Sequence, residues 1–164
     1  MKFLIDSDVL IQAYKMYYPL DVAPGFWRQL HEAAAAGEIQ SIDRVRNEVY
    51  TNPDELTQWC DDHLPDEFFL DTSDCIVQYA SIIRWGESRD DHYNRTALAE
   101  LATATNADPW LVAMAMANQD YQVVTQERSN PARRRRVMLP DICTAHGVLC
   151  RNTIDRLRLL GRSF

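Results

Sequence analysis

Apolar and polar positions fall into blocks along this chain, and the blocks predict strands that alternate with helices. Residues 3–5 form a short apolar run that predicts a buried strand and that acids at Asp6 and Asp8 follow at once, and the apolar positions of residues 9–17 recur at helical spacing. A second short strand is expected at residues 39–42, with a helix over 44–50 after it. This order predicts an α/β fold built on a parallel sheet.

The middle of the chain is predicted to be mostly helical. Residues 68–70 are apolar and are expected to form a short strand or a loop. The expected helices cover residues 25–36, 54–63, 72 to 84 or 85, and 90 or 91 to 103. Thr72 is expected to cap the third of these helices and Gly86 to close it. We find no candidate catalytic or metal-binding residues in this part of the chain.

The last third of the chain contains a nearly all-apolar helix between further strands. Asp108 is expected at its N-cap with Pro109 at the first helical position, and residues 110–117 are apolar enough for a buried helix. Strands are expected at residues 121–125 and 136–139, and residues 148–150 could form a fifth. A helix should start at Pro140–Asp141, and Asn152 is expected to cap a last helix that Gly161 ends.

Composition limits the class of protein. The chain has 164 residues, of which 46% are hydrophobic, so a single domain over residues 1–164 is expected. It contains no apolar run long enough to cross a bilayer, and we expect a soluble, cytoplasmic protein without a membrane partner. The net charge of −7 argues against binding nucleic acid through general surface charge, but it does not exclude a polyanionic substrate.

Acids recur after the ends of strands, at the start of the buried helix, and within the helix that follows residues 39–42. The carboxyl ends of parallel strands share one edge of the sheet, so acids at these places should converge there. The acids in question are Asp6, Glu48, Asp108, Glu127 and Asp141. Gathered carboxylates repel one another unless protons or cations neutralise them, and hard oxygen ligands suit Mg²⁺ or Mn²⁺. Such a site could hydrolyse phosphodiester bonds.

Three of these acids also have structural interpretations. Asp6, like Asp8, could cap the helix that follows it. Arg44 precedes Glu48 by one helical turn, so Glu48 could form an exposed ion pair with it instead of facing the sheet edge. Asp108 could cap its helix, although capping uses one carboxylate oxygen and leaves the other free. The spacing of the residues does not decide between these roles.

The chain resembles the PIN nuclease domain. The resemblance rests on residues 4–9, Glu48, residues 107–111, residues 123–127 and residues 140–143. More closely, nearly the whole chain is similar to a PIN-like family of unknown function from prokaryotic toxin–antitoxin operons. The resemblance implies a three-layer α/β/α fold, with a short parallel sheet of four or five strands. It also implies a Mg²⁺- or Mn²⁺-dependent endoribonuclease toxin that a cognate antitoxin protein restrains, and it allows a homodimer.

Carried over by position, the resemblance assigns the catalytic and metal-binding acids. Asp6, Glu48 and Asp108 match the core acids of the PIN family, and Thr125 matches the hydroxyl of its Thr-x-Asp motif. Glu127 stands where that motif has Asp, and Asp8 stands where Asn is commoner. Glu127 is therefore expected as the fourth acid, with Asp141 as the alternative, and Asp8 and Thr125 as supporting residues.

A run of arginines follows the predicted site. The side chains of Arg133, Arg134, Arg135 and Arg136 could grip RNA phosphates beside the site, contact an acidic segment of an antitoxin, or lie in a solvated loop.

Two other classes of protein compete with the nuclease. A haloacid-dehalogenase-type phosphatase would use Asp6 as its nucleophile, but it needs a later lysine and none lies beyond Lys15. A catalytically inactive PIN-like binding module would retain the acids only as caps and ion pairs.

Overall fold

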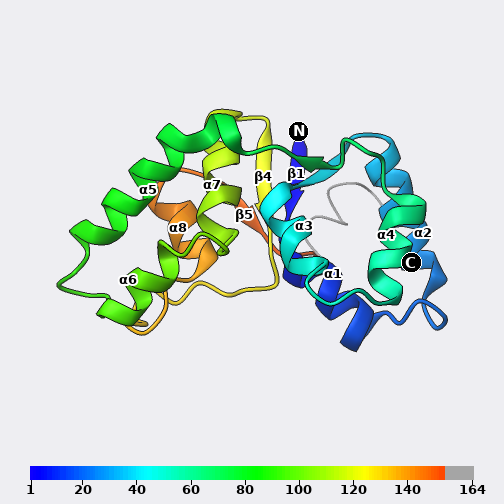
Figure 1. Cartoon of the computed structure of the whole chain (residues 1–164), viewed down its shortest axis with the longest axis horizontal. Coiled ribbons are helices and arrows are strands. Elements are labelled where there is room, and N and C mark those ends of the chain that lie inside the picture. The colour runs from blue at the N-terminus through cyan, green and yellow to red at the C-terminus, as the bar shows by residue number, and fades with distance from the viewer. Residues whose placement is uncertain (154–164) are drawn as a thin grey trace.

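The computed structural model describes residues 1–153, which form one parallel sheet with helices on both faces (Figure 1). The strands are β1 (Lys2–Ile5), β2 (Ile39–Ile42), β3 (Phe69–Leu70), β4 (Tyr121–Val124) and β5 (Cys150–Arg151). The α-helices are α1 (Ser7–Gln12), α2 (Pro24–Ala35), α3 (Asp43–Val49), α4 (Glu55–His63), α5 (Ile76–Ser88), α6 (Arg95–Leu101), α7 (Asp108–Ala117) and α8 (Leu139–Ala145). A π-helix, η1 (Ala13–Tyr17), extends α1, and a 3₁₀ turn, η2 (Ser73–Cys75), precedes α5.

The five strands lie in the order β3-β2-β1-β4-β5 and all pair in parallel. β1 is central: Phe3 lies opposite Ile39 of β2 and opposite Gln122 of β4. Strands buried on both faces by helices are expected to be continuously apolar. Phe3, Leu4 and Ile5 are accordingly 1%, 0% and 0% exposed. The predicted α/β fold with a short parallel sheet is confirmed.

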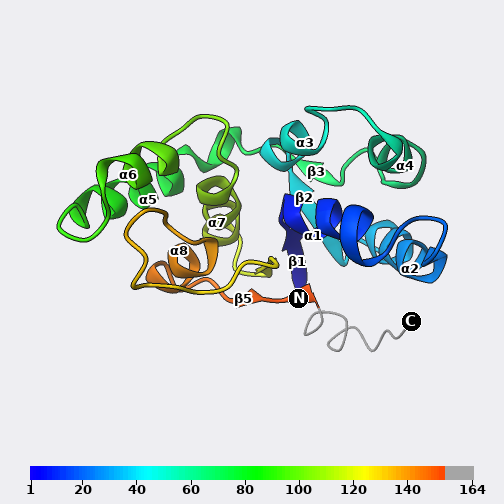
Figure 2. The same cartoon turned by 90° about the horizontal axis from the view of Figure 1, so that it is seen from below.

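The helices form two layers, one on each side of the sheet. Figure 2 shows α5, α6, α7 and α8 on one side and α1, α2 and α4 on the other. The central helix of the first layer is α7, which contacts both β4 and α5. Its residues Leu111, Val112 and Ala113 are fully buried, so the prediction of a buried helix is confirmed.

Residues 136–139 do not form the fourth strand that the sequence predicts. Residues 125–138 contain neither helix nor strand, and α8 begins at Leu139. Val137 and Met138 are nevertheless buried, at 5% and 8% exposure. Short apolar runs that are buried in a loop have the same pattern as a buried strand, so periodicity cannot distinguish them.

Three predicted helix boundaries are also wrong. Gly86 does not close α5 but lies within it, where a Cβ atom would come within 2.6 Å of a Leu101 methyl group of α6. Glycine here allows close packing of the two helices. Thr72 does not cap α5, because its hydroxyl instead donates to Asp43 Oδ1 at 2.8 Å. Helix α6 begins only at Arg95, with Asn94 as its N-cap.

The helix predicted after Asn152 lies outside the described residues. Within residues 1–153, no helix is long and apolar enough to cross a membrane.

Candidate functional site

A cavity of about 420 Å³ lies at the carboxyl edge of the sheet, where ligands bind in open α/β folds. We call it the acidic pocket. Its walls come from the residues that follow β1 and β4 and from α3, α6, α7 and the loops beside them. The acidic side chains that line it are Asp6, Asp8, Glu48, Glu100, Asp108 and Glu127, and the one basic side chain is Arg136.

Asp6 and Asp8 are held together by Thr125. Asp6 caps α1 through Oδ1, which accepts from the Ser7 backbone N–H at 2.7 Å. The Thr125 hydroxyl lies 3.2 Å from Asp6 Oδ2 and 3.0 Å from Asp8 Oδ2. A hydroxyl has one proton to donate, so it cannot serve both carboxylates at once. The two carboxylates therefore share an environment that favours a proton or cation between them.

Glu48 faces the sheet edge and not Arg44. The Ser7 hydroxyl donates to Glu48 Oε2 at 2.6 Å, and the backbone N–H of Ala107 donates to Glu48 Oε1 at 3.2 Å. Arg44 turns away: its guanidinium donates to the carbonyl of Ala104 and stacks over the ring of Trp110. Glu48 thus connects α3 to the start of α1 and to the start of α7.

Asp108 is not the helix cap that the sequence suggests. It is the first residue of α7, and its backbone N–H donates to the side-chain oxygen of Asn106 at 3.1 Å. The carboxylate of Asp108 is therefore not used in capping. It lines the acidic pocket and lies 3.7 Å from the guanidinium of Arg136.

Glu127 is bound on both oxygens. Its Oε1 forms an ion pair with Arg136, and its Oε2 accepts from the backbone N–H of Leu139 at 2.9 Å. Its own backbone N–H donates to the Thr125 hydroxyl at 3.1 Å. Arg136 also lies 3.7 Å from Glu100, so one guanidinium contacts three acids of the pocket.

Burial and mutual repulsion raise the pKa values of the central aspartates. The pKa of Asp6 lies well above 3.8, because Asp6 is buried and the charges of Asp108, Asp8 and Glu48 are close. Burial also raises the pKa of Asp8. The pKa of Asp108 rises to about 7 through burial and through Glu127, against the opposing effect of Arg136. Removing water from these carboxylates without neutralising them is unfavourable, which is the electrostatic condition of a cation site.

The donor atoms suit a hard divalent cation, because Mg²⁺ and Mn²⁺ prefer carboxylate oxygens. Asp8 Oδ1 is buried and has no hydrogen-bond partner among the described residues. No three His, Cys, Asp or Glu side chains in residues 1–153 are arranged to hold a metal ion, however. The residues fit in chemical type, and their side chains must turn toward one another to share an ion.

Asp141 lies apart from this pocket. Its side chain accepts from the hydroxyl of Ser129 and from the backbone N–H of Asn130 at 3.0 Å. The strand expected at residues 136–139, which would have brought it to the sheet edge, does not form. Asp141 therefore fixes the loop after β4, and the acid that reaches the pocket is Glu127.

The arginine run is divided. The side chains of Arg133, Arg134 and Arg135 are exposed, whereas Arg136 lines the acidic pocket. Arg133 and Arg134 also hold the loop through their backbone carbonyls, which accept from His92 Nε2 and from the Asn94 backbone N–H.

Sequence reasoning overlooks Ser7, Glu100 and the inward position of Arg136. Ser7 could be noticed, because it lies between two candidate acids at the start of a helix. Nothing in the local sequence marks Glu100, whose helix contributes to the pocket only through the tertiary fold.

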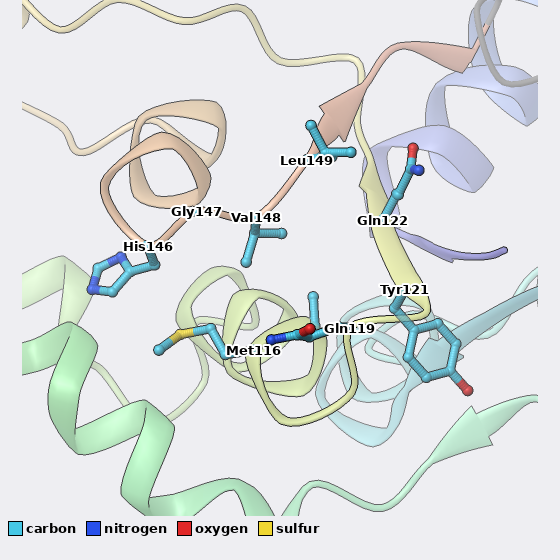
Figure 3. Close-up of a pocket in the computed structure, with 9 residues that line it drawn as sticks. Met116, Gln119, Tyr121, Gln122, His146, Gly147, Val148 and Leu149 are labelled. Carbon is cyan, nitrogen blue, oxygen red and sulfur yellow. The ribbon is translucent and has the colours of Figure 1, made fainter.

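A second cavity, of about 500 Å³, lies at the opposite edge of the sheet (Figure 3). It is lined by the end of α7, the start of β4 and the segment 146–149. His146 lines it, but its Nδ1 atom is 2.8 Å from the carbonyl oxygen of Ile142. No acid lines this cavity, so the groups suited to metal or acid–base chemistry are gathered at the other edge.

Comparison with known proteins places the chain by family. No curated protein and no solved structure matches it. A family model described as "Domain of unknown function (DUF4411)" matches residues 3–164. The chain therefore belongs to the DUF4411 family over nearly its whole length.

Proposed function

We propose that this protein is a divalent-metal-dependent endoribonuclease. The observation that carries the proposal is the acidic pocket: carboxylates from separate parts of the chain converge at the carboxyl edge of a parallel sheet. The resemblance to the PIN domain, made on Asp6, Glu48, Asp108 and the segment 123–127, supports the same class of reaction. A Mg²⁺ or Mn²⁺ ion bound there would lower the pKa of water and offset charge on a phosphodiester.

The chain's own residues have distinct roles in this proposal. Asp6, Glu48 and Asp108 supply the carboxylates that would hold the ion, and Asp8 adds the oxygen that lacks a partner among the described residues. Ser7 orients Glu48 through the 2.6 Å hydrogen bond, and Thr125 fixes Asp6 and Asp8. These contacts hold the acids at one place in the pocket, from which their side chains must still turn to share an ion.

Arg136 balances part of the charge when no ion is bound. Its contacts with Glu127, Asp108 and Glu100 neutralise acids on one side of the pocket. The carboxylate of Glu127 is occupied by this ion pair, so we assign Glu127 the role of positioning Arg136 and the loop after β4. Glu127 would bind a metal ion directly only when the ion pair opens.

The toxin role and the antitoxin partner follow from the resemblance alone. A toxic ribonuclease needs an inhibitor in the same cell, and an acidic antitoxin segment could contact the exposed residues Arg133, Arg134 and Arg135. Co-expression with a neighbouring gene product, followed by copurification, tests this part of the proposal separately.

A specific observation favours a second candidate, a non-catalytic binding module. Arg136 already neutralises acids in the pocket, and no three-residue metal group is present in residues 1–153. In a module of this kind the carboxylates would serve as caps and ion pairs, and the protein would bind its partner without cutting it.

Cleavage of RNA distinguishes the two. Purified protein should cut a labelled single-stranded RNA with Mg²⁺ or Mn²⁺ and stop when EDTA is added. Asp6→Asn is the control, because Asn caps α1 as well as Asp does but removes a charge from the pocket. Absence of cleavage by the wild type would favour the module, and equal cleavage by the variant would identify a contaminating nuclease.

A further inference from the structure

A third cavity, of about 500 Å³, shares Glu127 with the acidic pocket. It lies at the same edge of the sheet, between the end of α1, η1, the loop after β4, and β5. We call it the flanking pocket. Its lining includes Gln12, Tyr17, Gln126, Arg128 and Arg151. Because the two pockets have a wall in common, a ligand strand that passes the acidic pocket has the flanking pocket as its next binding place.

The two pockets have opposite charge. Glu127 is the one acid that lines the flanking pocket, and Arg136 neutralises it. Arg128 and Arg151 both line the pocket, and neither forms an ion pair with an acid within residues 1–153. Arg151 uses Nε to donate to Gln122 Oε1 at 2.6 Å, so its position is set while other guanidinium N–H groups remain to bind an anion. In a chain of net charge −7, these two arginines are a local concentration of positive charge that suits a phosphate.

An aromatic ring lies at the same pocket. Tyr17 is the last residue of η1, where the helix widens so that Tyr18 N–H bonds to the Ala13 carbonyl at 2.7 Å. Such π-type turns often occur at functional sites because they redirect the side chains that follow. Tyr17 lines the flanking pocket and is 56% exposed, so its ring is accessible to a ligand. Unpaired RNA bases stack on rings of this kind.

We propose that the flanking pocket binds one nucleotide of a single-stranded RNA beside the position that is cut. Arg128 and Arg151 bind its phosphate, Tyr17 stacks on its base, and the amides of Gln12 and Gln126 contact the base edge. This rests on the proposed ribonuclease function and names how that site holds its substrate. It also explains how a chain with an acidic reaction site retains a polyanion: the anionic strand is held by the adjacent arginines and not by the pocket of carboxylates.

The test is RNA binding in EDTA, measured by fluorescence anisotropy with a fluorescein-labelled single-stranded oligoribonucleotide. Without metal, binding is separated from cleavage. Arg128→Ala and Arg151→Ala should each weaken binding and reduce the salt slope by about 0.7 for each phosphate that the variant no longer binds. Tyr17→Ala should weaken binding by about 5- to 150-fold, the factor that corresponds to the usual contribution of one stacked base. Tyr17→Phe should retain wild-type affinity.

Arg84→Ala is the matched control, because Arg84 is exposed on α5 and lines neither pocket. Arg151→Lys retains the positive charge and checks that weaker binding by Arg151→Ala is not a folding defect, which the thermal unfolding of each variant also reports.

If Arg128→Ala, Arg151→Ala and Tyr17→Ala all bind RNA as the wild type does, the flanking pocket proposal is wrong while the ribonuclease proposal stands. Absence of RNA binding by the wild type in EDTA would overturn the flanking pocket proposal, while the cleavage assay with Mn²⁺ tests the ribonuclease proposal by itself. Binding of a deca-glutamate peptide in place of RNA, weakened by the same substitutions, would reassign the pocket to an acidic protein partner and overturn the RNA proposal.

Discussion

Glu127 and Arg136, nine residues apart in the loop between β4 and α8, form an ion pair at the wall of the acidic pocket. The same guanidinium lies 3.7 Å from Asp108 and 3.7 Å from Glu100. A positive side chain thus stands among the acids that would bind a metal ion, and it competes with that ion for Asp108 and, when the ion pair opens, for Glu127.

Replacing Arg136 should therefore have opposite effects on the metal-free and metal-bound protein. In EDTA, Arg136→Ala should lower the free energy of unfolding by about 1–2 kcal/mol, since partly exposed ion pairs contribute less than fully buried ones. With Mn²⁺, the variant should gain more stability than the wild type, because a competing cation is gone. Urea unfolding in EDTA and in Mn²⁺ measures both effects. Arg135→Ala, at an exposed position, is the control, and equal Mn²⁺ gains in wild type and Arg136→Ala would contradict the competition.

The edge of the sheet is where the sequence is most informative. The strand at residues 39–42 is predicted with its observed bounds, and the strand at residues 3–5 is predicted one residue short of its observed start at Lys2. Parallel topology then requires the residues after β1 and β4 to meet. For this reason the pattern predicts Asp6 and Glu127 at one edge, whereas it leaves the roles of Glu48 and Asp108 open and wrongly adds Asp141.

The contacts inside the pocket are not predictable from the sequence. In the sequence, Arg136 is one of four neighbouring arginines that could all lie on the surface. In the structure, acids from α6, α7 and the β4–α8 loop set its position. Segment 136–139 has the pattern of a strand because a buried loop has the same apolar pattern. Both errors arise from tertiary contacts that leave no periodic signal in the chain.

Thr125 is predicted to organise the two aspartates that follow β1. Thr125→Val keeps the shape of the buried side chain but leaves the Glu127 backbone N–H and the Asp6 and Asp8 oxygens without the hydroxyl. It should lower the free energy of unfolding by about 1–2 kcal/mol and reduce RNA cleavage. Thr125→Ser keeps the hydroxyl and should retain most of the wild-type stability and most of the RNA cleavage. Cleavage that is unchanged in Thr125→Val would show that the hydroxyl has no part in positioning the site.

The raised pKa of Asp108 predicts a pH-dependent stability. The pKa of this carboxyl group is about 7 in the folded protein, against 3.8 as its ordinary value. Between these values the folded state binds a proton that the unfolded state has released, so metal-free stability falls as the pH rises. Asp108→Asn has no such proton. The free energy of unfolding of the variant should therefore rise relative to that of the wild type as the pH is raised from 3.8 through about 7. Urea unfolding in EDTA at several pH values measures this difference. A difference that does not change with pH would refute the shift.

Asp6→Asn should leave the metal-free protein as stable as the wild type or more stable. Asn caps a helix as well as Asp does, and the substitution removes a buried charge that Asp108, Asp8 and Glu48 oppose. Thermal unfolding in EDTA checks this. A large drop in stability would mean that the Asp6 carboxylate is chiefly a structural group.

The most direct test of a metal site in the acidic pocket is the change in unfolding temperature that Mn²⁺ causes in wild type and in Asp6→Asn. An ion that binds only the folded protein stabilises it by about 2.7 kcal/mol at a hundredfold excess over Kd. We predict a Mn²⁺-dependent rise of the wild-type unfolding temperature, reversed by EDTA, and a much smaller rise for Asp6→Asn. Equal rises in the two proteins, or none in either, would contradict the assignment of a metal ion to these carboxylates.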